Sequence, residues 1–144
     1  MAGDIWVKHD TLNLETHSGN WDIDTDVFKI VLLTSASNIA TTSVVATGSV
    51  TGEVANGLGY TTGGQVLTCT GSQLAGVFTF TSATQLVWTA TGGSLVARYA
   101  GLYNTTRNVV VAHALLDSGD QDVTVTDTND LTLDQNASGI YTIT

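Results

Sequence analysis

The chain has 144 residues, of which 42% are apolar and 12% are charged, and its 13 acidic and 4 basic residues give a net charge of −9. This length is typical of one domain, which can bury a core without metals or disulfides. The acidic balance repels phosphate groups and anionic lipids, so we expect neither nucleic acid nor a membrane among the partners. The single cysteine, Cys69, excludes an internal disulfide and is expected to be a small buried apolar residue.

The N-terminal segment, residues 1–20, is polar and irregular, with Trp6 as its large apolar anchor. We therefore predict an arm that docks on a partner, followed by a single β domain over residues 21–144, and we expect the domain to fold without the arm. Tryptophan is enriched at the energetic centres of protein interfaces, which makes the arm and its flank the predicted contact surface. The candidate interface residues are Trp6, Lys8, His9 and Trp21.

Runs of strand-forming residues and turn residues alternate along the rest of the chain. The apolar run at 26–33 predicts a strand buried on both faces. Small polar residues at 34–57 predict a long connection with one weak helical turn at 43–46. The glycine-rich segment 57–64 predicts a turn in which the glycines adopt positive φ. Further strands are predicted at 65–70, 77–81, 85–90, 95–103, 109–116, 123–126, 131–133 and 140–144.

These segments amount to about eight or nine short strands separated by turns, which predicts an all-β fold. The expected architecture is an antiparallel β-sandwich or barrel, with a jelly roll among the topologies that fit. A parallel α/β fold would need amphipathic helices between the strands, and the sequence predicts none of that kind.

Three carboxylates at alternate positions, Asp22, Asp24 and Asp26, are the weak candidates for a metal site. Oxygen ligands of this kind suit calcium. The segment lacks the glycine and the distal glutamate of a calcium-binding loop, however, and a solvated approach to the next strand is the alternative. We therefore expect no metal and no other cofactor.

The other groups that could carry chemistry are scattered. The aspartates of the C-terminal third lie among turn residues, where we expect them to form turns rather than paired catalytic carboxylates. His9, His17 and His113 lack metal-ligand spacing, and His113 lies in an apolar strand as an expected core residue. Segment 57–64 lacks the Lys-Ser/Thr of a phosphate-binding loop. A hydrolase built on the aspartates and His113 stays a minor alternative.

Arg98 differs from the other charged residues, because it is one of four basic residues and lies in an apolar strand. A buried guanidinium must be paired with a carboxylate. We therefore predict a structural salt bridge from Arg98 to an aspartate, either within the chain or across a subunit boundary.

Four segments carry the most distinctive pattern in the chain. They read DTDVFKIVLL at 24–33, TGEVANGLGYTTGG at 51–64, VWTATGGS at 87–94 and ARYAGLYN at 97–104. In this order, within residues 22–104, they resemble a family of small structural proteins of tailed-phage particles, which are described as head-decoration proteins.

The resemblance implies a β-rich protein with no enzymatic role, made in the host cytoplasm and present in many copies on the virion. We therefore predict a capsid decoration, or cement, protein on the exterior of the head. Its expected partner is the major capsid protein, whose neighbouring subunits it would bridge, and a homodimer or homotrimer would strengthen weak contacts by multivalency. Two alternatives remain: a tail or fibre-base structural protein, and a carbohydrate-binding β-sandwich whose exposed aromatic rings stack on sugars.

Overall fold

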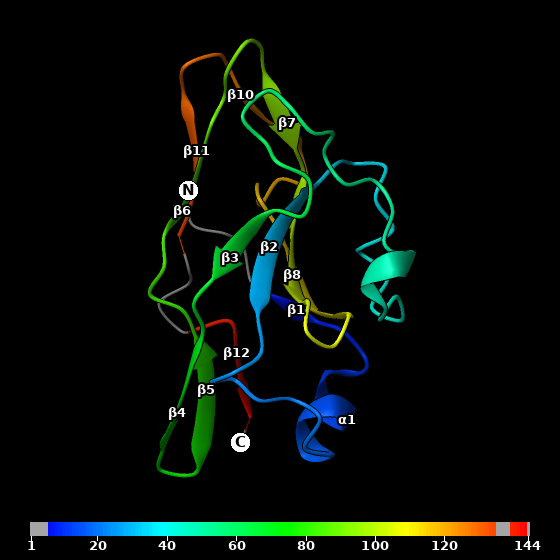
Figure 1. The fold of residues 1–144 in the computed structure, drawn as a ribbon, viewed down its shortest axis with the longest axis vertical. Helices are drawn as coiled ribbons and strands as arrows, with labels where there is room; N and C mark the ends of the chain where they lie inside the picture. The colour runs from blue at the N-terminus through cyan, green and yellow to red at the C-terminus, as the bar shows by residue number, and fades with distance from the viewer. Residues whose placement is uncertain (1–5, 135–138, 144) are drawn as a thin grey trace.

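The computed structural model describes residues 6–134 and 139–143, which form an antiparallel all-β fold (Figure 1). The prediction of the fold class is confirmed. Apart from the strands, the described residues form one short helix, α1 (Leu12–His17), and one 3-10 turn, η1 (Thr47–Ser49). The strands are β1 (Val7–Lys8), β2 (Phe28–Leu33), β3 (Gln65–Leu67), β4 (Thr70–Leu74), β5 (Val77–Thr81), β6 (Leu86–Thr89), β7 (Leu95–Ala97), β8 (Tyr99–Asn104), β9 (Val109–Leu115), β10 (Val123–Val125), β11 (Asp130–Leu133) and β12 (Tyr141–Ile143).

The largest sheet has five strands in the order β1-β9-β8-β2-β3. Its strand β2 is buried on both faces, as predicted, because successive side chains of a strand point to opposite sides. Ile30 and Leu32 enter the main core. Val31 and Leu33 enter a smaller cluster on the opposite side, together with Ile39 from the connection that follows β2. This explains why β2 is apolar at four successive positions, from Ile30 to Leu33.

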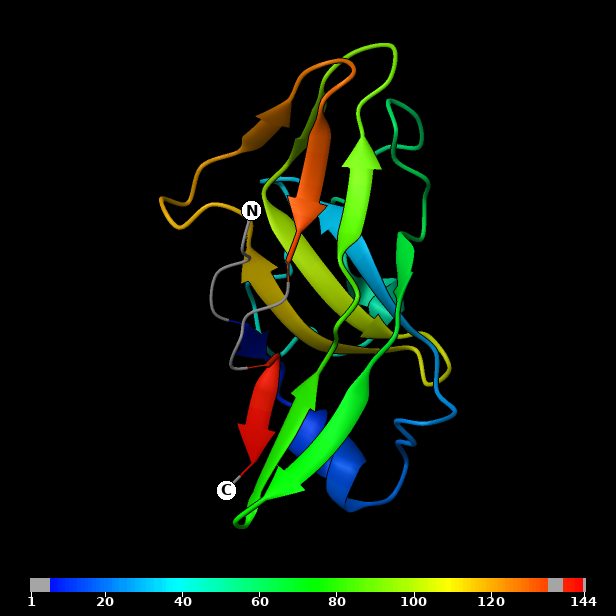
Figure 2. The same cartoon turned by 90° about the vertical axis from the view of Figure 1, so that its left-hand side faces the viewer.

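The smaller sheets pair β6 with β11 and β7 with β10, and join β12, β5 and β4 in that order. Figure 2 shows β6 and β11 side by side in front of β8, and β5 below them in front of α1. Strand β6 alternates in burial, with Leu86 and Trp88 turned inward and Val87 and Thr89 turned outward. The main core therefore lies between the β6–β11 layer and the five-stranded sheet, and none of the described sheets closes into a barrel. The sandwich alternative thus describes the fold.

The N-terminal segment is part of this fold, and the prediction of a separate arm is wrong for residues 6–20. Strand β1 pairs with β9 at the edge of the five-stranded sheet. Trp6 is 6% exposed and Leu12 is 1% exposed, and both belong to the main core. Residues 1–5 lie outside the described residues. We no longer expect the remainder of the chain to fold unchanged without this segment, because two large core side chains would be lost.

The described chain has more strands than predicted, because β1 and β4 were not predicted and one predicted strand is divided. Segment 65–70 corresponds to β3 and shares only Thr70 with β4, and segment 95–103 is interrupted at Arg98, between β7 and β8. The helical turn expected at 43–46 lies instead at η1. The last predicted strand corresponds to β12, and its final residue, Thr144, lies outside the described residues. No helix in the described part of the chain is long and apolar enough to cross a membrane.

The glycine-rich turn before β3 fits closely against the sheets. Gly59 and Gly64 have φ values of +92° and +69°, which confirms the predicted positive φ. A Cβ atom on Gly59 would lie 1.9 Å from the carbonyl oxygen of Thr89, and one on Gly64 would lie 1.9 Å from that of Ile30. Both the conformation and the close approach therefore require glycine.

Candidate functional site

The four predicted interface residues do not share one surface. Trp6 and His9 are 6% and 2% exposed, so the prediction that they face a partner is wrong. Trp21 is half-buried and packs against Phe28, with ring centroids 5.9 Å apart. Lys8 alone of the four is exposed. The difference arises because β1 pairs with β9, which turns Trp6 and His9 inward.

A buried pair of histidines joins the N-terminal segment to the sheet. Nε2 of His9 lies 3.0 Å from Nδ1 of His113, and Nδ1 of His9 lies 2.7 Å from the carbonyl oxygen of Val44. A carbonyl oxygen only accepts hydrogen bonds, so Nδ1 of His9 carries a proton and donates. In the neutral ring Nε2 then accepts, and Nδ1 of His113 donates to it. The predicted burial of His113 is confirmed at 6% exposure.

This pair is neutral at pH 7. Burial lowers the pKa of His113 to about 4, with a further contribution from the neighbouring His9. Burial also lowers the pKa of His9, although the hydrogen bond to Val44 opposes the shift. The sequence could not identify the pair, because its members are 104 positions apart and show no spacing signal.

The three carboxylates proposed as weak metal ligands serve the turn before β2. Oδ2 of Asp26 accepts hydrogen bonds from Nδ2 of Asn104 at 2.8 Å, Nε of Arg107 at 3.4 Å and the backbone N–H of Asp22 at 3.2 Å. Oδ1 of Asp22 accepts from the backbone N–H of Asp24 at 3.0 Å. Within the described residues, no group of three His, Cys, Asp or Glu side chains is placed to hold a metal ion.

Asp26 is a buried structural carboxylate, because its side chain is 2% exposed. Burial alone would raise its pKa, but the hydrogen bonds from Asn104, Asp22 and Arg107 outweigh burial and lower the pKa below its usual value. Asp26 therefore fastens the segment before β2 to the end of β8.

The predicted salt bridge of Arg98 forms within the chain. Its Nε lies 2.8 Å from Oδ1 of Asp122, and its Nη1 lies 3.5 Å from Oδ1 of Asp120. The expected burial is wrong, because the guanidinium side chain is 23% exposed. Arg98 lies at the break between β7 and β8, where its side chain reaches the turn before β10 rather than the core.

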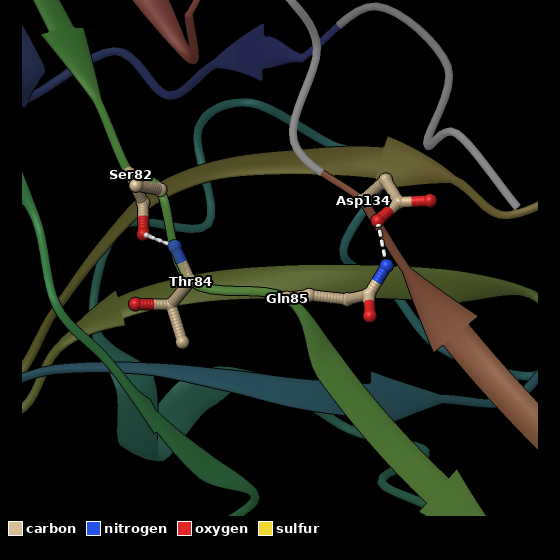
Figure 3. Close-up of a pocket in the computed structure, with 5 residues that line it drawn as sticks. Ser82, Thr84, Gln85 and Asp134 are labelled. Atoms are coloured by element: carbon tan, nitrogen blue, oxygen red, sulfur yellow. Dashed lines mark hydrogen bonds between the residues drawn. The ribbon is translucent and has the colours of Figure 1, made fainter.

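A polar cavity of about 210 Å³ lies beside the end of β5 (Figure 3). Its side chains are already used by the fold. Ser82 Oγ donates to the carbonyl oxygen of Thr68 at 2.6 Å and accepts from the backbone N–H of Thr84 at 3.1 Å. Nε2 of Gln85 donates to Asp134. Ser82 therefore closes a local turn, which is a structural role.

An open groove of about 350 Å³ lies between the segment before β2 and strand β3. Val27 and Val66, at 43% and 56% exposure, are its solvent-facing apolar side chains. Cys69, at one end, is half-buried rather than fully buried. Burial raises the pKa of its thiol to about 12, so the thiol is not ionised at pH 7. The groove thus offers the apolar side chains of Val27 and Val66, beside the carboxylates of Asp24 and Asp26, rather than a reactive group.

The β4–β5 hairpin continues from this groove and extends away from the body of the molecule (Figures 1 and 2). All five residues of β4 are exposed, and Leu74 at its end is 82% exposed. Residues 54–97, which include the hairpin and β3, contain no Asp, Glu, Lys, Arg or His. The chain as a whole has a net charge of −9, so the surface of this hairpin differs from the rest of the molecule in carrying no charged side chain of its own.

Sequence reasoning predicted β5 as an ordinary strand, did not predict β4 beyond Thr70, and missed the exposure of the hairpin. The signal that could have identified it is the long uncharged run at 54–97, interrupted by Ala75-Gly76 between two strand-like segments. No family model, curated protein or solved structure matches this chain.

Proposed function

We propose that this protein is a non-enzymatic structural protein of a tailed-phage head, which decorates the exterior of the shell and bridges neighbouring major capsid protein subunits. The family is suggested by the resemblance of segments 24–33, 51–64, 87–94 and 97–104. The binding role is carried by one observation: an exposed surface consisting of the uncharged β4–β5 hairpin and the adjoining Val27–Val66 groove, whose lining also includes Asp24 and Asp26.

The resembling segments contribute to the fold in ways that agree with a structural role. Glu53 accepts hydrogen bonds from the Tyr60 hydroxyl at 2.7 Å and from the backbone N–H of Gly63 at 2.6 Å. The same hydroxyl accepts from the backbone N–H of Leu32 at 3.3 Å. Segment 51–64 is thereby fixed to β2, which supports a rigid frame for the groove.

The groove and the hairpin suit contact with another protein. Burying Val27 and Val66 removes apolar area from water, which stabilises a complex by about 25 cal/mol per Å². Of the two carboxylates that line the groove, Asp26 is already paired with Asn104 and Arg107, and Asp24 is exposed. The acidic residues, concentrated in the first 26 positions and after Arg98, keep many copies soluble at high local concentration. A weak contact at each subunit becomes strong when several form together.

A carbohydrate-binding role has less support, because stacking on sugars needs exposed rings. Among the side chains that the structure describes, Trp6, Phe28, Tyr60, Phe80, Trp88 and Tyr103 are buried, and Trp21, Phe78 and Tyr99 are half-buried. A tail or fibre-base position remains the main rival, and it differs from the proposal in location rather than in chemistry.

The first test locates the protein on intact particles produced from the genome that encodes it. Gold-labelled antibody and electron microscopy should show label spread over the whole head. Label restricted to the tail would replace the proposal by the tail alternative. Particles without any label would overturn both structural roles.

A second test asks whether the groove makes the contact. Purified protein should bind heads that lack it, and Val66→Lys, which places a charge in the groove, should reduce this binding at least about tenfold, the equivalent of 1.4 kcal/mol. Val96→Lys is the matched control, because Val96 is a 39% exposed strand residue in β7 at the other end of the molecule. Equal binding by both variants would exclude the groove.

A further inference from the structure

One edge of β4 is not paired with another described strand, and the hairpin geometry determines which of its residues point their backbone N–H and C=O groups outward. Ala75 and Gly76 have φ values of +50° and +82° and form the two-residue turn between β4 and β5. In such a hairpin the closing pair, Leu74 and Val77, is hydrogen-bonded, and the pairs then alternate along the ladder. The backbone N–H and C=O groups of Gly71 and Gln73 therefore point away from β5.

The opposite edge of β5 supports this assignment independently. The carbonyl oxygen of Phe80 accepts a hydrogen bond from the backbone N–H of Ile140 at 2.8 Å, on the side of β12. Phe80 is the register partner of Gly71 across β4–β5. Because the Phe80 carbonyl points toward β12, it cannot also bond Gly71, whose backbone groups must then face solvent.

This edge lacks the features that usually protect an exposed strand. Edges are commonly blocked by lysine, proline, a bulge or a covering segment. Strand β4 contains Thr70, Gly71, Ser72, Gln73 and Leu74, all exposed, and its pairing with β5 is continuous. Among the described strands it pairs with β5 alone. It is therefore open to pairing with another strand.

We propose that β4 pairs antiparallel with β4 of a second copy of this chain, around a two-fold axis at Ser72. In this register Gly71 of one copy faces Gln73 of the other, and the same pair repeats across the axis. Each pair exchanges two backbone hydrogen bonds, so four form in total, and all use groups that already point outward. Ser72 of one copy then lies directly opposite Ser72 of the other.

Charge favours a second copy over other partners. Two chains of net charge −9 repel each other, and the repulsion is least where neither surface carries charge. Residues 54–97 carry no charge and include all of β4, and the acidic segment nearest to it is 22–26, whose Ile23 side chain lies beside Gly71. The aspartates after Arg98, which would attract a basic partner, are remote from β4 in the chain and lie around β10 and β11.

The expected association is weak in dilute solution. A stable interface buries about 1,200–2,000 Å² in total, which a five-residue edge does not approach alone. High local concentration or attachment of both copies to one surface would strengthen the pairing. This inference deepens the proposed function, because a two-fold pair would present two Val27–Val66 grooves, but it does not depend on a phage head.

The test is disulfide trapping with purified protein in a Cys69→Ala background. In the proposed register the two Ser72 residues form a non-hydrogen-bonded pair with Cα atoms about 4.5 Å apart, within the range for a disulfide. Ser72→Cys should therefore yield a covalent dimer under mild oxidation. Leu74→Cys is the matched control, because the two copies of Leu74 would be four residues, or about 13 Å, apart along the strands.

The experiment distinguishes specific pairing from random collision, because Leu74, at 82% exposure, is an accessible position that specific pairing does not bring together. Random collisions would cross-link Leu74→Cys at least as fast as Ser72→Cys, and that result would overturn the proposal. A mixture of Thr70→Cys and Leu74→Cys should form a heterodimer, since these positions face each other in the register. Far-UV circular dichroism confirms folding of each variant. Because no particle is involved, this test can fail while head binding succeeds, and the reverse.

Discussion

The N-terminal segment and the β4–β5 hairpin show opposite relations between sequence and burial. The first is polar and was expected to contact a partner, yet Trp6, His9 and Leu12 are among the most buried residues. In the second, only β5 was predicted as a strand, and its unpredicted partner β4 is exposed along its whole length. Burial follows from what lies next to a segment in the fold: Trp6 and Leu12, before and after β1, pack into the main core, whereas β4 ends a three-stranded sheet and all five of its residues are exposed.

The largest expected effect contrasts the same substitution in the two regions. Leu12→Ala removes a core side chain that is 1% exposed and should lower the free energy of unfolding by about 2–5 kcal/mol. Leu74→Ala, at 82% exposure, should change it by less than about 0.5 kcal/mol. Urea denaturation followed by circular dichroism measures both. Similar losses in the two variants would contradict the assignment of the N-terminal segment to the core.

The second prediction concerns the histidine pair that holds this segment. His113 has a folded-state pKa of about 4, below the 6.5 of the unfolded chain. Between these two pH values His113 is protonated in the unfolded chain but not in the folded chain. The free energy of unfolding is therefore highest above pH 6.5 and decreases as the pH falls toward 4. The expected loss is roughly 3 kcal/mol. Denaturation curves at a series of pH values measure it.

His113→Gln should flatten this pH dependence, even if the variant is less stable throughout. His17→Gln is the control, because His17 is exposed on α1 and its substitution should leave the slope unchanged. A wild-type protein whose stability does not change between pH 6.5 and 4 would show that the pair is not buried and neutral.

Local patterns predicted much of the fold but not the contacts between distant segments. The alternating and continuous apolar runs located β2, β5, β6, β9 and β11, because burial on one or both faces leaves a direct trace in sequence. The pairing of His9 with His113, and of Arg98 with Asp120 and Asp122, depends on topology, which the runs do not encode. The exposed edge of β4 could not be predicted for the same reason, because the sequence of a strand does not indicate whether the strand lies at the edge of a sheet.

The third prediction concerns Asp26, the buried carboxylate between the N-terminal segment and β2. Its folded-state pKa lies below the usual value near 3.8, so the stability it contributes is present above pH 3.8 and is lost as the pH falls through the folded-state pKa. Asp26→Asn should cost about 1–3 kcal/mol at pH 7 and remove the pH dependence below 4, while keeping the histidine-dependent loss above it. Asp24→Asn, at an exposed position, should neither lower the stability at pH 7 nor change the pH dependence below 4. Loss of both slopes in Asp26→Asn would mean that the two sites are coupled.

The smallest expected effect comes from two adjacent proline substitutions, which test whether one edge of β4 is free of backbone hydrogen bonds. Proline lacks a backbone N–H and is tolerated in a strand only where that N–H would face solvent. Ser72 donates its N–H to β5 in the proposed alternation, whereas Gln73 points outward, so Ser72→Pro should destabilise the protein by at least about 1 kcal/mol more than Gln73→Pro. Urea denaturation measures the difference, and the reverse order would show that the alternation along β4 is assigned the wrong way round. If the order holds, Gln73→Pro also removes an outward donor without unfolding the hairpin, and it should reduce disulfide trapping at Ser72→Cys for that reason alone.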